Sequence, residues 1–457
     1  MSRRSPECDY SYQSVEDDHT NNATISTSRT KGDARVQGIY FMLGCADLLP
    51  WNALITATPY FLKRLTGSSL QPTFVSYMSC IFTGVNVIAL AYATLTSKQT
   101  AVSPSRRIVS STVVLVILIA LLFMTTFVRF PPSIFFSLVL LITVGQVVAA
   151  SYHSAAISGE ASLFGGPYMS ALISGQAAVA VAVSALQLVS SALSVWGTST
   201  NSGQASTMLE NEALDTAAES AARVLFGISA LFLIATVVSY CWMRQLPIYK
   251  STVSPQQQHR GETSEENEEL QRLVGSEPSF KPLYELDEMQ RVFKANLPYE
   301  FASLYCFVIT LAVFPVITVQ TQSTNPSIHP LLFMAAHFLV FNIGDLLGRY
   351  ACSIPQLVIC VQRARVELGS TTDPLIPSDL VYMIILLFLG ISNGYISSSS
   401  MIGCASLEHN PRLKGRREDV DVAATLNNFC IITGLAVGSA ASFSVRAMLC
   451  DCNPFKG

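Results

Sequence analysis

Long apolar runs separated by short polar stretches dominate this chain. A helix needs about 20 mostly apolar residues to cross the hydrocarbon core of a bilayer. Six such runs lie in the first part, at 38–61, 74–95, 108–128, 133–156, 169–195 and 224–242. Four more follow, at 297–319, 330–350, 380–402 and 422–449. The pattern therefore predicts an all-α membrane protein with ten spans.

Two polar stretches divide the chain. Residues 1–36 are rich in Ser, Thr, Asp and Asn and lack the apolar core of a signal peptide, so we expect a disordered cytosolic tail. Residues 244–292 are charged and rich in Gln and Glu, which is typical of a flexible cytosolic loop. The organisation that follows is an N-terminal six-helix half at 37–243 and a C-terminal helical half at 293–457.

Composition agrees with a membrane setting. Half of the 457 residues are hydrophobic and 13% are charged, about half the charged fraction of an average soluble domain. The charges are confined to loops and tails, so we expect no nucleic-acid partner. The 11 cysteines are scattered, mostly within apolar runs, and predict no disulfide or zinc framework. We expect a monomer in contact with membrane lipid, with no metal and no cofactor.

The positions of Lys and Arg predict the orientation, because cytoplasmic loops are enriched in both. With the N-terminal tail in the cytosol, most basic loops fall on the inner side, among them 409–419. Arg363 and Arg365 should be inside as well, but a single span, 380–402, separates them from that loop. One crossing is missing or hidden. The nearby apolar piece 353–361 would reach only about 14 Å as a helix, less than half of a roughly 30 Å hydrocarbon core.

The span 330–350 carries an acid and a base one helical turn apart, in FNIGDLLGR (341–349). A charge at bilayer depth costs at least about 2.5 kcal/mol on insertion scales, so Asp345 and Arg349 should face a watered, protein-lined cavity and not lipid. Asn342 lies on the neighbouring flank of the helix. The carboxylate accepts hydrogen bonds and the guanidinium donates them without losing its charge. An ion pair that only fastens helices together is the alternative.

The first span of each half is interrupted by a proline, Pro50 in LLPWN and Pro315 in VFPVI. Proline inside a helix removes one backbone hydrogen bond and frees a carbonyl about four residues earlier. Matching interruptions in two halves point to a central binding site in transporters. A packing kink is the alternative for either proline.

These segments resemble the equilibrative nucleoside transporter family, which has a major-facilitator-like arrangement of eleven spans. The matching pieces occur in order, as LLPWNALITATPYF (48–61), ISGQ (173–176), FPVITVQ (314–320), FNIGDLLGR (341–349), SNGY (392–395) and GLAVGSAASFSVRAML (434–449). ATPYF (57–61) and PLIPSD (374–379) resemble fungal members in particular. The resemblance implies a carrier, not an enzyme, that moves nucleosides and in some members nucleobases by alternating access, either facilitative or weakly proton-coupled.

The resemblance also implies which residues contact the substrate. In the family pattern Asp345 and Arg349 bind the ribose hydroxyls and hold the two halves in register. The other positions expected to contact substrate or to form a gate are Leu48, Trp51, Ile55, Ser154, Phe314, Phe338 and Asn342. Plain helix packing is the alternative for the aromatic residues among them. Helix packing is the expected role of Asn52, Gln176 and Asn393.

Three features depart from the family pattern. Ser154 stands where members often carry a glutamine that addresses the nucleobase, and His153 before it can replace that glutamine, sense pH or serve as a packed hydrogen-bond partner. Asp47 is an acid where small neutral residues are common, so it either supports proton coupling or lies near the aqueous mouth. The chain also passes from VICV to QRARVELGSTTD where the ninth span should be. We expect most of that helix to be lacking, through a gene-model error, a splice form or a genuine loss.

Other classes of protein fit less well. A major-facilitator carrier of another solute is disfavoured, because no G-x-x-x-D-R-x-G-R motif follows the second span. A non-transporting receptor or scaffold, including a truncated inactive form, remains an alternative. No HExxH motif lies in the spans, which argues against an intramembrane metalloprotease. A vacuolar or endosomal membrane and the plasma membrane are both compatible with the sequence.

Overall fold

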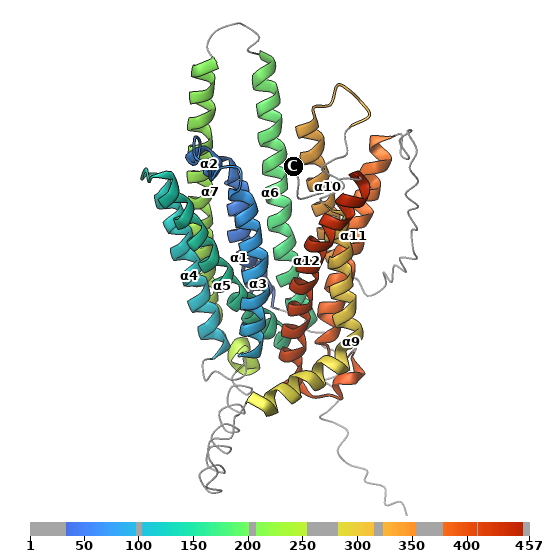
Figure 1. Ribbon diagram of the computed structural model, residues 1–457. Helices are drawn as coiled ribbons and strands as arrows, with labels where there is room; N and C mark the ends of the chain where they lie inside the picture. The colour runs from blue at the N-terminus through green and yellow to red at the C-terminus, as the bar shows by residue number, and fades with distance from the viewer. Residues whose placement is uncertain are drawn as a thin grey trace, which may run out of the picture.

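The computed structural model is a bundle of long α-helices (Figure 1). It describes residues 33–96, 103–200, 207–253, 282–314, 323–352, 378–408 and 410–450. Ten of the described helices are long and apolar enough to cross a membrane, which confirms the predicted all-α membrane fold with ten spans.

The helices of the first half are α1 (Ala34–Thr56), α2 (Thr58–Arg64), α3 (Phe74–Leu95), α4 (Pro104–Thr125), α5 (Pro132–Phe164), α6 (Gly166–Thr200) and α7 (Thr207–Met243). Residues 247–253 are also helical. The second half contains α9 (Pro282–Val313), α10 (Pro330–Ala351), α11 (Asp379–Cys404), the short 3-10 helices η2 (Pro411–Leu413) and η3 (Arg417–Asp419), and α12 (Val420–Cys450). Helix α9 therefore begins inside the range 244–292 that we expected to be a loop, and its first turns lie across the base of the bundle (Figure 1).

Local sequence explains several helix ends. Pro104, Pro132 and Pro330 occupy the first turns of α4, α5 and α10, where the missing N–H has no helical partner in any case. Gly165 separates α5 from α6 with a φ of 99°, a left-handed conformation that glycine adopts without steric cost. Pro50 does not interrupt α1, which stays helical through it. Pro315 lies outside the described residues.

The first half contains two pairs of parallel helices. In α1 and α6, a Cβ added to Gly44 would collide with the Leu172 carbonyl, and one added to Gly175 would collide with the Phe41 carbonyl. Only glycine allows backbones to approach this closely. In α3 and α5, Phe74 meets Phe136 edge-on and the Ser151 hydroxyl donates to the Asn86 side chain at 3.0 Å. In α1 and α6, Asp33 lies beside Tyr168 and Asp47 beside Gln176, and in α3 and α5 the numbers of the contacting residues likewise rise together. The helices of each pair therefore run in the same direction.

The second half repeats this arrangement. Helices α9 and α12 pack closely where Gly434 faces the Leu304 carbonyl and Gly438 faces Phe307. Helices α10 and α11 do so where Gly390 faces the Phe341 carbonyl and Gly394 faces the Asp345 carbonyl. Both pairs are again parallel. The two halves are therefore built on the same plan, with α1, α6, α3 and α5 corresponding to α9, α12, α10 and α11.

The parallel packing of α10 and α11 bears on the missing crossing. Near the base Cys352 Sγ donates to the Tyr395 carbonyl at 3.0 Å, while Gly390 contacts α10 further up. The end of α10 and the start of α11 consequently lie at opposite ends of the bundle. This arrangement of the two helix ends agrees with the expectation, from the count of basic loops, that one more crossing belongs between them.

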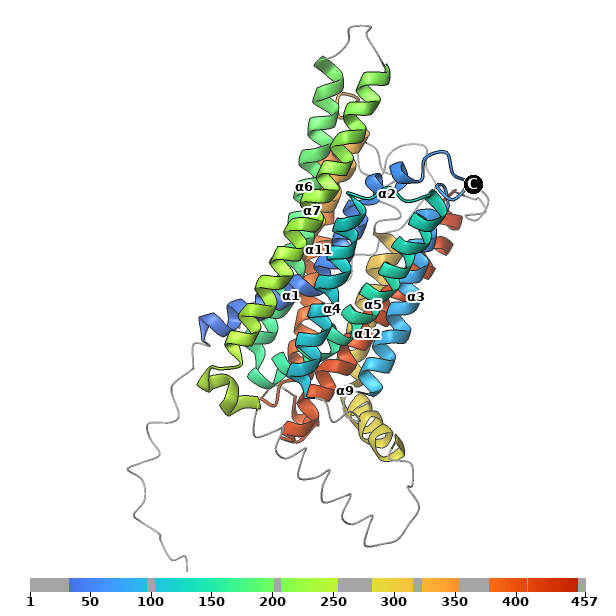
Figure 2. The same cartoon turned by 90° about the vertical axis from the view of Figure 1, so that its left-hand side faces the viewer.

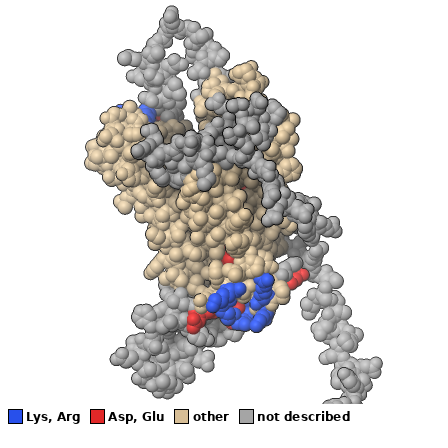
Figure 3. Space-filling view, turned by 45° about the vertical axis from the view of Figure 1, so that its right-hand side comes forward, with Lys and Arg blue, Asp and Glu red and all other residues tan. Residues whose placement is uncertain are grey.

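The halves meet along two seams, which Figures 1 and 2 show from two sides. One seam joins α6 to α10, and the other joins α5 and α3 to α12. On the face that Figure 3 shows, most charged side chains of the described residues gather at the lower end, below a wall almost free of charge, and a small basic patch lies at the upper left. Among the exposed basic residues of the η2–η3 segment are Arg412, Lys414 and Arg417.

Candidate functional site

Asp345 and Arg349 form a buried ion pair in α10. Arg349 Nε donates to Asp345 Oδ2 at 2.8 Å, and Asn393 Nδ2 of α11 donates to Asp345 Oδ1 at 2.7 Å. Arg349 Nη1 reaches the other half of the molecule, where it donates to the backbone carbonyl of Ile173 on α6 at 3.0 Å. Both side chains lie away from lipid, and the pair ties three helices together.

Two asparagines extend this contact. Asn393 Oδ1 accepts from Thr310 Oγ1 of α9 at 2.9 Å and from Cys306 Sγ at 3.4 Å, so its side chain links α9, α10 and α11. Asn342 Nδ2 donates to Ser184 Oγ of α6 at 2.6 Å. Asn342 therefore binds the opposite half about two helical turns along α10 from Arg349.

Asp47 is the second buried carboxylate at the boundary between the halves. Its Oδ2 accepts from Gln176 Nε2 of α6 at 2.9 Å and from Ser154 Oγ of α5 at 3.1 Å. Ser154 Oγ accepts in turn from Asn428 Nδ2 of α12 at 3.0 Å. Asp47 is 7% exposed and so lies inside the bundle and not at an aqueous mouth. This chain of contacts joins the halves at their second seam.

The remaining residues of the first span pack within the first half. Trp51 stacks on Phe82 of α3, with ring centroids 3.5 Å apart and an angle of 17° between the planes. Asn52 Nδ2 donates to the Leu48 carbonyl of its own helix at 2.8 Å. Leu48 is partly buried, and Ile55 is 40% exposed. In this structure one face of the Trp51 ring therefore packs against a neighbouring helix.

An aromatic cluster lies between α9 and α10. Phe314 stacks on Phe341 with centroids 4.0 Å apart and meets Phe338 edge-on at 5.3 Å. Phe338 lies one turn before Asn342 on α10, so the cluster adjoins the seam to α6. The structure thus brings together the two phenylalanines that the sequence suggested as gate residues.

His153 fastens α5 to α4. Its ring is buried, and Nδ1 lies 3.2 Å from Thr112 Oγ1 and 3.5 Å from Ser111 Oγ. Of the three roles considered for this residue, the geometry fits the packed hydrogen-bond partner. The ring points toward the α4 side of the half, whereas Ser154 points toward Asp47.

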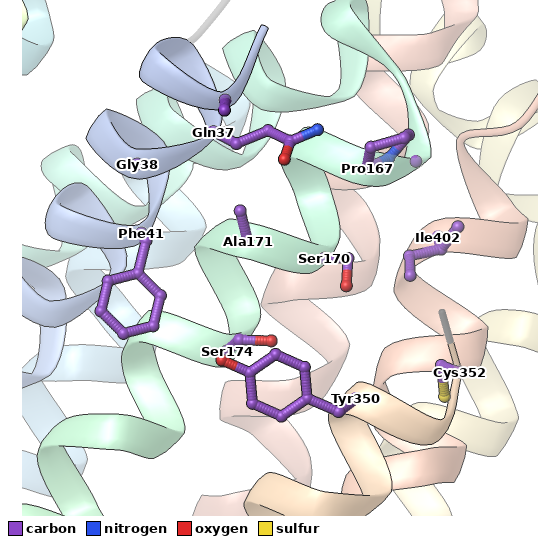
Figure 4. A pocket seen from close by; sticks show the side chains of 12 residues that line it. Gln37, Gly38, Phe41, Pro167, Ser170, Ala171, Ser174, Tyr350, Cys352 and Ile402 are labelled. Carbon is purple, nitrogen blue, oxygen red and sulfur yellow. The ribbon is translucent and has the colours of Figure 1, made fainter. Parts of the chain in front are cut away.

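A cavity of about 720 Å³ lies between the lower ends of α1, α6, α10 and α11 (Figure 4). Figure 4 shows Phe41, Ser174 and Tyr350 around it. Asp345 and Arg349 do not line this cavity. Its lining does include Tyr350, which follows Arg349 in the chain, and Ser174, which follows Ile173, the residue whose carbonyl Arg349 binds. The ion pair itself is enclosed by the helix contacts described above.

Sequence reasoning missed a third buried acid, Glu160 of α5. Its carboxylate accepts hydrogen bonds from Tyr40 at 3.1 Å, from Tyr240 at 3.0 and 2.8 Å, and from Tyr249 at 2.8 Å. The predicted span ended at residue 156, so this acid fell outside it although the helix continues to Phe164. Asn428 was also missed. An amide inside the apolar run 422–449 was the available signal.

The described residues contain no group of three or more His, Cys, Asp or Glu side chains that could hold a metal ion.

A family model described as "nucleoside transporter" matches residues 139–358 and 351–447. Together the two matches cover well over half of the chain. The chain belongs to the nucleoside transporter family. It is therefore an integral, multi-pass membrane transporter and not an enzyme, and the resemblance stated from the motifs is confirmed.

Relatives in this family match along nearly the whole chain. Human equilibrative nucleoside transporter 2 is 27% identical over 90% of this chain and 96% of its own length. Human equilibrative nucleoside transporter 1 is 23% identical over the same shares. Equilibrative nucleotide transporter 1 of Arabidopsis thaliana is 23% identical over 89% of this chain and 84% of its own length.

Among solved structures, the human organic anion transporter MFSD10 matches with 12% identity and a TM-score of 0.45, over 91% of this chain and 94% of that one. A variant of the E. coli fucose:proton symporter FucP matches with 12% identity and a TM-score of 0.46, over 92% of this chain and 93% of that one.

Proposed function

We propose that this protein carries nucleosides through a path between its two halves, which open alternately to the two sides of the membrane. Membership of the nucleoside transporter family and the substrates named for its relatives support the substrate class. One structural observation supports the mechanism. Arg349 of the second half donates a hydrogen bond to the Ile173 carbonyl of the first, so this contact between the halves is broken and formed again when the halves rock.

The ion pair offers a place for the sugar. Nε and Nη1 of Arg349 are engaged, whereas the described residues place no hydrogen-bond partner on Nη2. A guanidinium N–H directed into a widened seam suits a ribose hydroxyl, which can accept that bond and donate to Asp345. We propose the remaining contacts at Leu48, Trp51, Ile55, Ser154, Phe314, Phe338 and Asn342.

We further propose that the N-terminus and the basic lower end of the bundle are cytosolic, which the enrichment of Lys and Arg at that end supports. The membrane is vacuolar, endosomal or plasma membrane, and the working unit is a monomer surrounded by lipid.

Uptake of labelled uridine and adenosine tests the function, in cells that lack their own nucleoside carriers. We expect saturable uptake by the wild-type chain and a strong reduction for Arg349→Lys, because lysine keeps the charge but loses the planar fork. Arg412→Lys is the matched control, since Arg412 is exposed in the η2 segment. Background uptake by a well-expressed, correctly located wild-type protein contradicts the proposal.

Background uptake by the wild-type protein would favour a non-transporting form. One observation supports that alternative. The family match falls into two pieces that overlap at 351–358, where the chain should make its ninth crossing. We propose that the natural message encodes about 20 further apolar residues at this point, the length of one span. Sequencing the transcript tests this. A message that matches the present sequence without interruption contradicts it and leaves a shortened carrier.

A further inference from the structure

The buried carboxylates of the bundle differ in the groups that lie around them. Asp345 forms a salt bridge with Arg349. Glu160 lies in the first half and accepts from three tyrosine hydroxyls. Glu300 of α9 is enclosed in the second half beside Asn427 and Cys430 of α12. Asp47 alone among these four combines a position between the halves with the absence of a cation partner.

Among the described residues Asp47 has no cationic partner. Its two hydrogen-bond donors, Gln176 Nε2 and Ser154 Oγ, are both neutral. The titratable groups on the helices around it have other contacts. The His153 ring of α5 lies between Thr112 of α4 and the backbone of Leu43, one helical turn before Asp47 on α1. Cys45 of α1 donates to the Gly175 carbonyl, Cys430 of α12 lies beside Glu300, and Asp345 and Arg349 of α10 form an ion pair.

An isolated charge in such a site is costly. An ionised carboxylate without a counter-ion in an apolar interior is destabilised by several kcal/mol or more and takes up a proton instead. The two oxygens of Asp47 are not equivalent. Oδ2 accepts both hydrogen bonds, while the described residues place no partner on Oδ1. Oδ1 is therefore the atom at which a proton can bind without disturbing the contacts of Oδ2.

The contacts of Asp47 connect protonation to the movement of the halves. Ser154 joins Asp47 to Asn428 of α12, and Gln176 lies three residues after Ile173, the partner of Arg349. Two of the three contacts between the halves described above therefore lie close to this carboxyl group. Asn428 binds Ser154, which itself donates to Asp47, and Arg349 binds Ile173, one helical turn before Gln176. When the halves separate, Ser154 loses Asn428 and the carboxyl group gains access to water on the open side.

We infer that Asp47 binds and releases one proton in each transport cycle, so that the protein moves a nucleoside together with a proton. The inference rests on the proposed function and adds the driving ion to it. Hydronium on one side gives its proton to the carboxylate, so one O–H bond breaks in hydronium and one forms on Asp47. The site opens to the other side with Asp47 neutral, and the proton returns there to water, which reverses that exchange. No other covalent bond forms or breaks.

The full-length protein in sodium-free liposomes separates this inference from the proposed function. Exchange of labelled for unlabelled uridine at equal pH tests nucleoside transport alone. A gradient of one pH unit, acid outside, is then imposed with the membrane potential clamped. We expect uridine to accumulate severalfold above equilibrium, with a limit of about tenfold for one proton per nucleoside. Uridine added outside should also acidify the lumen, as a trapped pH dye reports.

Exchange without accumulation and without acidification overturns the inference while the proposed function stands. Absence of exchange in the wild-type protein contradicts the proposed function and removes the inference with it.

Variants of Asp47 test whether this residue is the one that binds the proton. Asp47→Asn keeps the acceptor and the size of the side chain, and it should abolish accumulation and acidification. Asp47→Glu keeps the carboxyl group and should retain both. Glu300→Gln is the matched control, a buried acid away from the boundary, and should behave as wild type. Accumulation that survives Asp47→Asn or disappears in Glu300→Gln overturns the assignment. If Asp47→Asn yields no folded protein, loss of acidification in Asp47→Glu overturns it.

Discussion

The two seams between the halves each contain a buried aspartate, but the two acids are held in different ways. Asp345 has both oxygens bonded and an arginine on the same helix. Asp47 has one oxygen bonded, by two neutral donors, and no cation. The comparison teaches that burial alone does not define the role of an intramembrane acid. An arginine compensates the charge of Asp345, whereas among the described residues no cation compensates that of Asp47.

The largest expected effect comes from separating Asp345 from its cation. Arg349→Met leaves a buried carboxylate uncompensated, which costs about 3 to 5 kcal/mol. We expect a large drop in the thermal stability of the detergent-solubilised protein. The double variant Asp345→Asn with Arg349→Met removes both charges and should recover part of the loss. Equal stability of the single and double variants would show that the ion pair does not hold the seam.

The next effect concerns the backbone contact beneath the ion pair. Gly394→Ala places a methyl group against the Asp345 carbonyl, so α10 and α11 have to move apart, at a cost of about 1 to 3 kcal/mol. Gly84→Ala is the matched control, because a Cβ at this position of α3 meets no atom within 4 Å. Alanine there should stabilise the helix by up to about 1 kcal/mol. Thermal melting of the two variants should therefore shift in opposite directions.

The second seam should respond more mildly. Ser154→Ala removes the hydroxyl that donates to Asp47 and accepts from Asn428, and the loss should be about 1 to 2 kcal/mol. Asn428→Ala should cost less. The double variant should be little worse than Ser154→Ala, because both changes remove the same contact. Additive losses in a melting experiment would place Asn428 outside this network.

The smallest effect is expected at the edge of the first network. Thr310→Val removes one donor to Asn393 and leaves the Cys306 thiol near the same oxygen, so about 1 kcal/mol or less should be lost. A loss as large as that of Arg349→Met, measured in the same way, would mean that Asn393 and not Arg349 positions Asp345.

Sequence patterns predicted the spans well, because apolar length is a local property. The range 74–95 coincides with α3. Helices α5 and α7 extend beyond their predicted spans, to Phe164 and back to Thr207, since hydropathy measures the apolar stretch and not the end of the helix. Glu160 was missed for this reason.

The site was predictable to the extent that it is local. Asp345 and Arg349 lie four residues apart, so helical spacing alone brings them together. Asp47 and Gln176 are 129 residues apart, and their contact depends on α1 packing against α6. The carbonyl of Ile173 carries no side-chain signal at all. Which helices face each other is a property of the whole bundle, and neither spacing nor composition reports it.

Helices α10 and α11 are matched by their glycines, which admit the neighbouring backbone in one register and one direction. The contacts with α10 therefore help to set the direction of α11, in addition to the number of spans that precede it. If one span before α11 were removed, the number of spans would predict the opposite direction from the one that these contacts require. The glycine contacts would still hold α11 parallel to α10.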